Sequence, residues 1–184
     1  MEKKNTRLAI ILISIIGICL IGCLGIGLAI HFWPNIYQYS LNNSSLKVGD
    51  AAPDFELISL NGETMRLSQF TGQPILLSIG ASWCPDCRIE APLLQKLHED
   101  HPELVILLVD TKESPDVVQN FVDEFSMTHP VLLDQDGSVS KLYQVFAIPT
   151  EIFIDKDGII QAKIIESVTP KLLADKLPLI GINP

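Results

Sequence analysis

The chain has 184 residues, of which 47% are hydrophobic, and a net charge of −9. That length has room for one domain and a short additional segment. Residues 34–184 contain ten Lys and Arg against 21 Asp and Glu, a net charge of −11. So acidic a domain argues against nucleic acid and anionic lipid headgroups as partners.

Residues 8–30 contain no charged side chain and are rich in Ile, Leu and Gly. At about 1.5 Å per residue, a helix of this length crosses the ~30 Å hydrocarbon core of a membrane. Lys3, Lys4 and Arg7 precede the apolar run, and Trp33 follows it. The positive-inside rule therefore predicts a cytoplasmic N-terminus over residues 1–7, a single transmembrane anchor over 8–33, and an extracytoplasmic remainder.

A lipid anchor is the alternative, because residues 20–23 (Leu-Ile-Gly-Cys) resemble a lipobox in which Cys23 carries the lipid. Residues 24–30 stay apolar, which favours the transmembrane span. Both interpretations place the domain outside the cell membrane, and as residues within the bilayer Cys19 and Cys23 are not expected to take part in redox chemistry. Residues 34–45 are polar and predict a tether.

Residues 46–184 predict an α/β domain. Apolar runs and turn residues predict strands at 55–58, 64–67, 75–79, 104–110, 131–133, 151–155 and 159–165, and helices at 84–100, 114–125, 138–143 and 170–179. The first two strands, joined at Asn61-Gly62, form a hairpin.

Two cysteines stand where the strand at 75–79 gives way to a helix. Cys84 would be the N-cap residue, Pro85 the first helical residue and Cys87 the third. Unpaired backbone N–H groups and the helix dipole favour the thiolate there, and one turn of separation allows an intramolecular disulfide. A zinc half-site has the same spacing, but there is no second C-x-x-C or His pair to complete it.

The stretch Gly80-Ala-Ser-Trp-Cys-Pro-Asp-Cys-Arg-Ile-Glu-Ala-Pro92 resembles the active site of thioredoxin-fold proteins, and in particular the membrane-anchored TlpA and ResA type. Residues 48–57 resemble the hairpin that opens that branch, and residues 147–150 (Ala-Ile-Pro-Thr) the segment with its cis-proline. The resemblance covers residues 46–184. It implies a thioredoxin fold, with a central mixed sheet flanked by helices and an N-terminal β-hairpin extension, and a thiol–disulfide oxidoreductase that needs no metal or organic cofactor.

The resemblance also implies roles for individual residues. Cys84 would be the nucleophile and the more exposed thiol, and Cys87 the resolving thiol. Glu90 would exchange a proton with Cys87, its pKa raised by partial burial; the alternative is a solvated glutamate on the helix surface. Standard thioredoxins carry a buried Asp six residues before the first cysteine, where this chain has Ser78.

Substrate contacts are expected from three further residues. Pro149 would be cis and face the disulfide, and Ile148 would offer its backbone and apolar side chain to a docked peptide. Trp83 would pack beside the site and limit solvent access, or serve as an ordinary core aromatic. The expected partners are protein thiols and disulfides outside the membrane and a redox protein in it. His98, His101 and His129 are interpreted as surface or loop residues.

The direction of electron flow is left open by the sequence. Pro85 removes an N–H donor and Asp86 adds a negative charge, which favour a reductant, with Arg88 opposing them. Cys-Pro-Asp-Cys in a tethered protein also resembles the thiol oxidases of Gram-positive cocci. Two rival functions, a peroxiredoxin-like peroxidase and a Sco-like copper-delivery protein, are disfavoured. The first needs a hydroxyl residue where Ala81 stands, and the second needs three residues between its cysteines.

Overall fold

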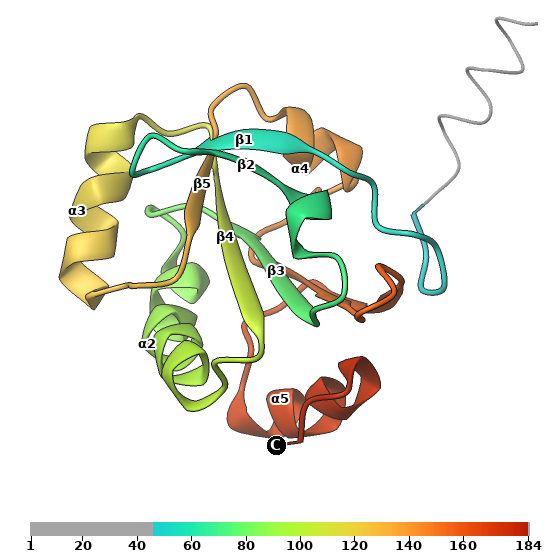
Figure 1. Ribbon diagram of the computed structural model, residues 1–184. Coiled ribbons are helices and arrows are strands. Elements are labelled where there is room, and N and C mark those ends of the chain that lie inside the picture. The colour runs from blue at the N-terminus through green and yellow to red at the C-terminus, as the bar shows by residue number, and fades with distance from the viewer. Residues whose placement is uncertain (1–45, 184) are drawn as a thin grey trace, which may run out of the picture. The chain divides into compact units, whose positions relative to one another are not determined.

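The computed structural model describes residues 46–183, which form a sheet with helices on both of its faces (Figure 1). In this part of the chain the sheet has seven strands in the order β2-β1-β5-β4-β3-β6-β7. Their bounds are β1 Glu56–Ser59, β2 Thr64–Arg66, β3 Ile75–Gly80, β4 Val105–Thr111, β5 Val131–Asp134, β6 Thr150–Ile154 and β7 Ile160–Ile164.

The centre of the sheet is parallel and its two sides are antiparallel. β3, β4 and β5 run parallel, whereas β6 pairs with β3 and β7 with β6 in the antiparallel sense. The β1–β2 hairpin pairs with β5 on the other side. All six residues of β3 are buried, as a continuous apolar run in a covered parallel strand requires.

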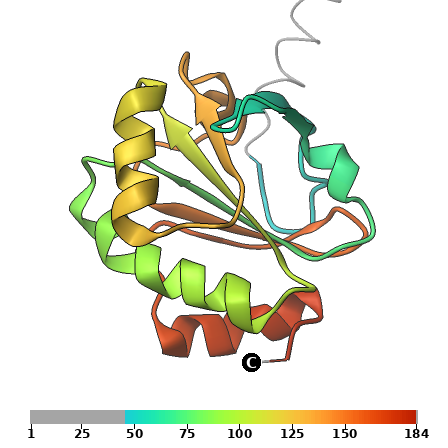
Figure 2. The same cartoon turned by 60° about the vertical axis from the view of Figure 1, so that its left-hand side comes forward.

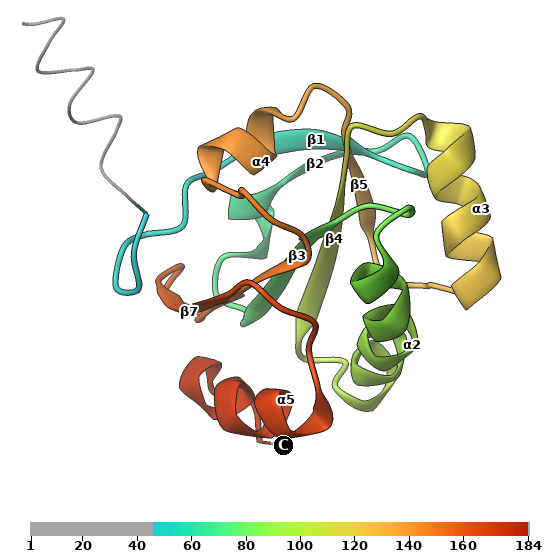
Figure 3. The same ribbon diagram turned by 180° about the vertical axis from the view of Figure 1, so that it is seen from behind.

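Three helices cover one face of the sheet: α2 (Pro85–Asp100), α3 (Pro115–Phe125) and α5 (Pro170–Lys176). The opposite face is covered by α4 (Ser138–Leu142) and the 3₁₀ helix η1 (Leu67–Phe70). Figures 2 and 3 show both layers. The closing helix is shorter than predicted: α5 ends at Lys176 and continues as the 3₁₀ helix η2 (Leu177–Ile180), because Pro178 lacks the N–H that an α-helix needs.

Side chains of β3 alternate between two apolar cores. Leu76 packs with Leu94 of α2 and Phe153 of β6, whereas Leu77 packs with the opposite core. Because strand residues two apart share a face, Ser78 lies on the same face as Leu76, beneath α2. That position is where the active-site acid of a standard thioredoxin is expected.

No helix within residues 46–183 is long and apolar enough to cross a membrane. The predicted anchor over 8–33, the tether over 34–45, Cys19 and Cys23 lie outside the described residues. The domain prediction for residues 1–45 therefore stays a prediction.

Candidate active site

Cys84 and Cys87 lie at the start of α2 and form a disulfide, with 5.3 Å between their Cα atoms. Cys84 is the N-cap residue, and its Sγ accepts the backbone N–H of Cys87 at 3.2 Å. Pro85 occupies the first helical position, where its missing N–H leaves no gap in the helix. A Cβ at Gly80 would lie 3.0 Å from the Cys87 Sγ. A side chain at Gly80 would therefore crowd the Cys87 sulfur.

The two cysteines are equally buried, which contradicts the expectation that Cys84 is the more exposed. Their exposed fractions are 3% and 4%. The physical reason is the segment before β6, whose Ile148 carbonyl oxygen lies 3.7 Å from the Cys84 Sγ. Burial therefore does not distinguish the attacking from the resolving sulfur, and position in the helix is the remaining criterion.

The Ile148–Pro149 peptide bond is cis. Pro149 is buried and Ile148 is half-buried next to the disulfide. The Thr150 hydroxyl donates to the Ala147 carbonyl at 2.7 Å, and this hydrogen bond bridges the two sides of the cis-proline turn. This arrangement leaves the backbone of Ile148 beside Cys84, where a bound peptide could pair with it.

Two exposed aromatic side chains lie close to the site residues in the sequence. Trp83 is 66% exposed, so it is not an ordinary core aromatic, and its expected place beside the site stays a prediction. Phe146, which sequence reasoning missed, is 81% exposed in the loop before the cis-proline. Lys163 Nζ donates to the Tyr143 carbonyl at 2.7 Å and lies 6.0 Å from the Phe146 ring centroid, which ties this loop to β7. Exposed aromatics beside a reactive pair suit the docking of apolar peptide segments.

Glu90 is buried beneath the disulfide, with 2% of its surface exposed, so it is not a solvated surface residue. Its Oε2 accepts the backbone N–H of Val168 at 3.0 Å. Burial, with a smaller contribution from the charge of Asp86, raises the pKa of Glu90 to about 7, against the lowering effect of the Val168 N–H. A carboxyl that titrates near neutrality can both accept and return a proton.

Glu151 is a second buried carboxyl, and sequence reasoning missed it. It is fully buried in β6, directly opposite Ser78 of β3, and the Ser78 hydroxyl donates to its Oε1 at 2.7 Å. Burial, followed by the charge of Glu90, raises the pKa of Glu151 well above its usual value. The available signal was a charged residue inside the otherwise apolar run 151–154 (Glu-Ile-Phe-Ile).

A third buried acid, Asp110, lies near the end of β4, opposite Gly80 of β3, and is 2% exposed. Burial and then the neighbouring Glu113 raise its pKa to about 8. Glu113 accepts the hydroxyl and the backbone N–H of Ser82, at 2.8 and 2.5 Å respectively. The loop before the cysteines is therefore held by carboxyl groups.

Arg88 does not offer a free positive charge to the sulfurs. Its guanidinium pairs with Glu124 of α3 and lies 5.2 Å from the ring centroid of Phe125. A second nitrogen donates to the Ser82 carbonyl at 3.2 Å. The positive charge of Arg88, which was expected to oppose the effect of Asp86 on the thiolate, is thus largely balanced by Glu124.

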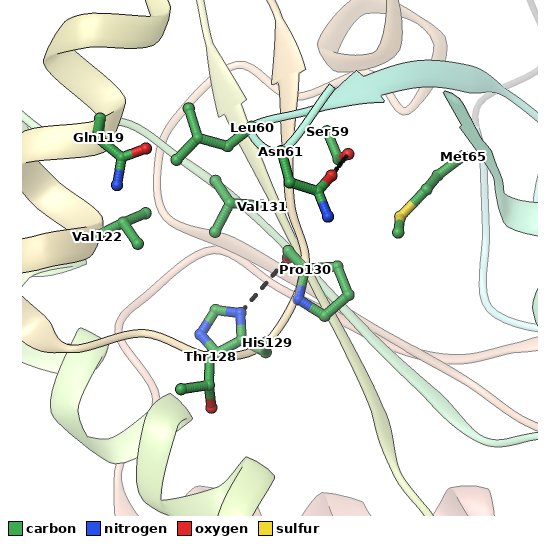
Figure 4. Close-up of a pocket in the computed structure, with 10 residues that line it drawn as sticks. All are labelled: Ser59, Leu60, Asn61, Met65, Gln119, Val122, Thr128, His129, Pro130 and Val131. Atoms are coloured by element: carbon green, nitrogen blue, oxygen red, sulfur yellow. Dashed lines mark hydrogen bonds between the residues drawn. The ribbon is translucent and has the colours of Figure 1, made fainter. Parts of the chain in front are cut away.

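His129 lies in the loop between α3 and β5, one of the two settings predicted for it, but its side chain is buried, with 4% of its surface exposed. Burial lowers its pKa to about 4, and the ring is neutral at physiological pH. It lines a pocket of about 300 Å³ between the β1–β2 hairpin and α3 (Figure 4). On its other side it borders a narrow cavity shared with Cys87 and Glu90. The larger pocket contains neither cysteine.

No cluster of three or more His, Cys, Asp and Glu that could hold a metal occurs within residues 46–183. Asp134, the last residue of β5, accepts the backbone N–H groups of Val139 and Ser140 at 3.0 and 2.9 Å. Its carboxylate therefore caps α4.

A C-x-x-C disulfide at a helix start, a cis-proline beside it and a buried carboxyl beneath it define a thiol–disulfide oxidoreductase with a thioredoxin-like α/β fold. The chain belongs to the AhpC/TSA family, whose model matches residues 48–163. It is 31% identical over 178 residues to the thiol-disulfide oxidoreductase ResA of Bacillus thuringiensis, covering 95% of this chain and 94% of the relative. It is 34% identical over 150 residues to the thioredoxin-like protein YneN of Bacillus subtilis, covering 79% and 88% of the two chains.

Two solved structures extend the comparison. StoA from Bacillus subtilis has 28% identity and a TM-score of 0.60, covering 70% of this chain and 99% of its own. A secreted thiol-disulfide isomerase from Corynebacterium glutamicum has 28% identity and a TM-score of 0.64, covering 74% and 93%. The names of the ResA relative and of the Corynebacterium glutamicum protein agree on thiol–disulfide chemistry.

Proposed function

We propose that this enzyme exchanges its Cys84–Cys87 disulfide and dithiol with cysteines of proteins outside the membrane, through a mixed disulfide. One observation carries the proposal: the disulfide lies between the start of α2 and the carbonyl of Ile148 before a cis-proline. A peptide strand that pairs with that backbone would bring its own sulfur next to Cys84.

Each step of the exchange balances. The Cys84 thiolate attacks one sulfur of a substrate disulfide, forming the Cys84–substrate disulfide and releasing a substrate thiolate. Cys87 gives its proton to Glu90, and the new thiolate attacks the Cys84 sulfur. The second substrate thiolate leaves, and the enzyme holds the Cys84–Cys87 disulfide. Two electrons pass to the substrate, and no other cofactor is required.

We assign the enzyme the role of reductant. A thiol–disulfide pair is strongly oxidising when its reduced form is stabilised. Here Asp86 lies in the first turn of α2, the ionisable Glu90 lies beside Cys87, and Arg88 is paired with Glu124. Negative surroundings destabilise a Cys84 thiolate and so favour the disulfide, which makes the dithiol a donor of electrons. A membrane-bound redox protein would re-reduce it.

The predicted location is the outer face of the cell membrane, with residues 8–33 as the anchor. The positive charges before this run and the acidic domain after it support that orientation. A membrane-impermeant maleimide applied to intact, reduced cells should label Cys84 and Cys87. Labelling only after lysis would contradict the location. If Cys23→Ala releases the protein from the membrane, the anchor is a lipid at Cys23.

We do not propose peroxide reduction, although the name of the AhpC/TSA family suggests it. Ala81 stands three residues before Cys84, where a peroxidase needs a hydroxyl residue, and Leu77 stands seven before, where it needs a proline. In the same way the two-residue spacing of the cysteines does not suit copper delivery.

The Cys87→Ser variant of the full-length chain tests the exchange mechanism. Reduced and mixed with a disulfide-bonded peptide, it should accumulate a peptide adduct on Cys84, seen by non-reducing electrophoresis and mass spectrometry. Cys84→Ser should form no adduct. An adduct carried by Cys19 or Cys23, or adducts of equal yield in both variants, would overturn the assignment.

A further inference from the structure

We infer that Glu151 is a positioning residue that donates a hydrogen bond to Glu90 beneath the disulfide and so stabilises the ionised form of Glu90. The inference rests on the proposed exchange at Cys84 and Cys87. It adds a residue on β6 to a site that otherwise lies on β3, α2 and the loop before β6. It also explains why a serine can stand where a standard thioredoxin has its acid.

The register of the sheet places the two positions together. Ser78 of β3 and Glu151 of β6 are direct antiparallel partners, and opposite residues of such a pair project from the same face. Both therefore lie on the α2 side, with Ser78 Oγ bonded to Glu151 Oε1 at 2.7 Å. An acid from the neighbouring strand thus fills the space that the Ser78 side chain leaves.

The remaining oxygen of Glu151 decides which carboxyl holds a proton. Among the described residues, no N–H or O–H donor reaches its Oε2, although this atom is buried. The group that faces it is the carboxyl of Glu90. Two carboxyl groups can share a hydrogen bond only if one of them is protonated. Glu90 already accepts the Val168 N–H, which favours its ionised form, so the proton resides on Glu151.

The surroundings of the pair do not supply a compensating cation. The titratable groups that face Glu90 are Asp86 and Cys87 on α2, Glu151 on β6, and His129 across the narrow cavity. These groups are acidic, or neutral in the case of His129. Burial alone would keep Glu90 protonated and unable to accept the proton of Cys87. The hydrogen bond from Glu151 opposes that effect, and the proton of Cys87 can then pass to Glu90.

Two substitutions of Glu151 separate this role from the alternatives. In Glu151→Gln the amide can still donate to Glu90 and accept from Ser78, whereas Glu151→Leu can do neither. The readout is the single-turnover rate of the resolving step against pH, measured on the full-length chain loaded with a fluorescent peptide at Cys84. In wild type the rate of the resolving step should rise with pH as Glu90 ionises, and we call this rise the acidic limb. We expect Glu151→Gln to have its acidic limb at the same pH as wild type. Glu151→Leu should move that limb upward by about one pH unit, which makes the step about tenfold slower on the limb.

Rescue and control variants sharpen the test. Ser78→Asp combined with Glu151→Leu returns a carboxyl to the adjacent strand position and should move the limb back toward wild type. Glu166→Gln, an exposed glutamate in the loop after β7, should leave the profile unchanged. Equal shifts in Glu151→Gln and Glu151→Leu would make Glu151 itself the proton acceptor and overturn the inference. An unshifted limb in Glu151→Leu would make it a packing residue and overturn the inference as well.

A spectroscopic measurement does not depend on turnover. Infrared difference spectra of the oxidised full-length chain should show one buried carboxyl that ionises near neutrality in wild type, and at higher pH in Glu151→Leu. If wild type shows this titration but exchanges no disulfide, the proposed function fails and the inference about the carboxyl pair stands. If Glu90 titrates at the same pH in both proteins, the inference fails.

Discussion

The two sides of the Cys84–Cys87 disulfide differ in chemistry. The side toward the sheet contains Glu90 and Glu151, both buried, whereas the side toward solvent has the exposed aromatic rings of Trp83 and Phe146. Proton transfer needs a carboxyl whose pKa is raised by burial, and docking of a protein needs an accessible apolar surface. The disulfide therefore lies between a proton-handling side and a binding side, and each can be altered separately.

The largest effect is expected on the proton-handling side. Glu90→Gln removes the acceptor for the Cys87 proton while keeping an oxygen that can accept the Val168 N–H. General bases contribute about 10²- to 10⁴-fold, so the resolving step at pH 7 should slow by about 100-fold. Formation of the Cys84 adduct should be nearly unchanged.

The matched control is Glu99→Gln, an exposed glutamate on the same helix. Stopped-flow release of a fluorescent peptide separates the two steps. If Glu90→Gln slows both steps equally, the carboxyl contributes to structure and not to proton transfer.

Asp110 predicts a pH dependence of stability on the buried side. Its pKa rises from 3.8 unfolded to about 8 folded, chiefly through burial, so the folded protein binds more protons between these values. Its stability contribution is complete below about pH 3.8 and is lost as the pH rises toward 8. Asp110→Asn should remove this loss and be more stable than wild type at pH 8 by on the order of 1–3 kcal/mol.

Urea unfolding at pH 5, 6.5 and 8 measures the difference between the two proteins. The free energy of unfolding of Asp110→Asn minus that of wild type should increase as the pH rises. His129 has the opposite sign, with stability lost as the pH falls from 6.5 toward its folded pKa of about 4, but it is present in both proteins and cancels. A difference that shrinks as the pH rises would contradict the burial of an ionisable Asp110.

The smallest effect is expected on the binding side. Trp83→Ser with Phe146→Ser removes the exposed rings and should raise KM for an apolar disulfide peptide by about three- to tenfold, corresponding to about 1 kcal/mol. The value of kcat should stay within twofold, because neither ring touches the carboxyl pair. Ile58→Ser, an exposed apolar residue of β1, is the control. A fall in kcat with no change in KM would mean that Trp83 and Phe146 contribute to the exchange reaction and not to peptide binding.

Local sequence patterns were sufficient to predict the cysteine end of the site. The start of α2 follows from Cys84 as a cap and Pro85 in the first helical position, and the burial of β3 follows from an unbroken apolar run. The cis bond at Pro149 could be expected only from the family resemblance, because most X-Pro bonds are trans.

The buried carboxyls could not be predicted in the same way. Glu151 is 73 residues from Ser78, and their contact depends on the register of two strands, which no local pattern gives. The exposure expected for Cys84 was wrong for a related reason. Cys84 is buried next to the loop before β6, whose Ile148 lies 64 residues away in the chain and comes close only in the assembled domain.

The redox potential of the full-length chain tests the central claim most directly. It is measured by equilibration with dithiothreitol and glutathione mixtures, with the Cys84–Cys87 state read by alkylation and mass spectrometry. The account predicts a potential at or below that of thioredoxin, about −270 mV, as expected for a reductant whose thiolate is disfavoured by neighbouring acids. A potential near −120 mV, the value of a strong disulfide-forming oxidant, would contradict it.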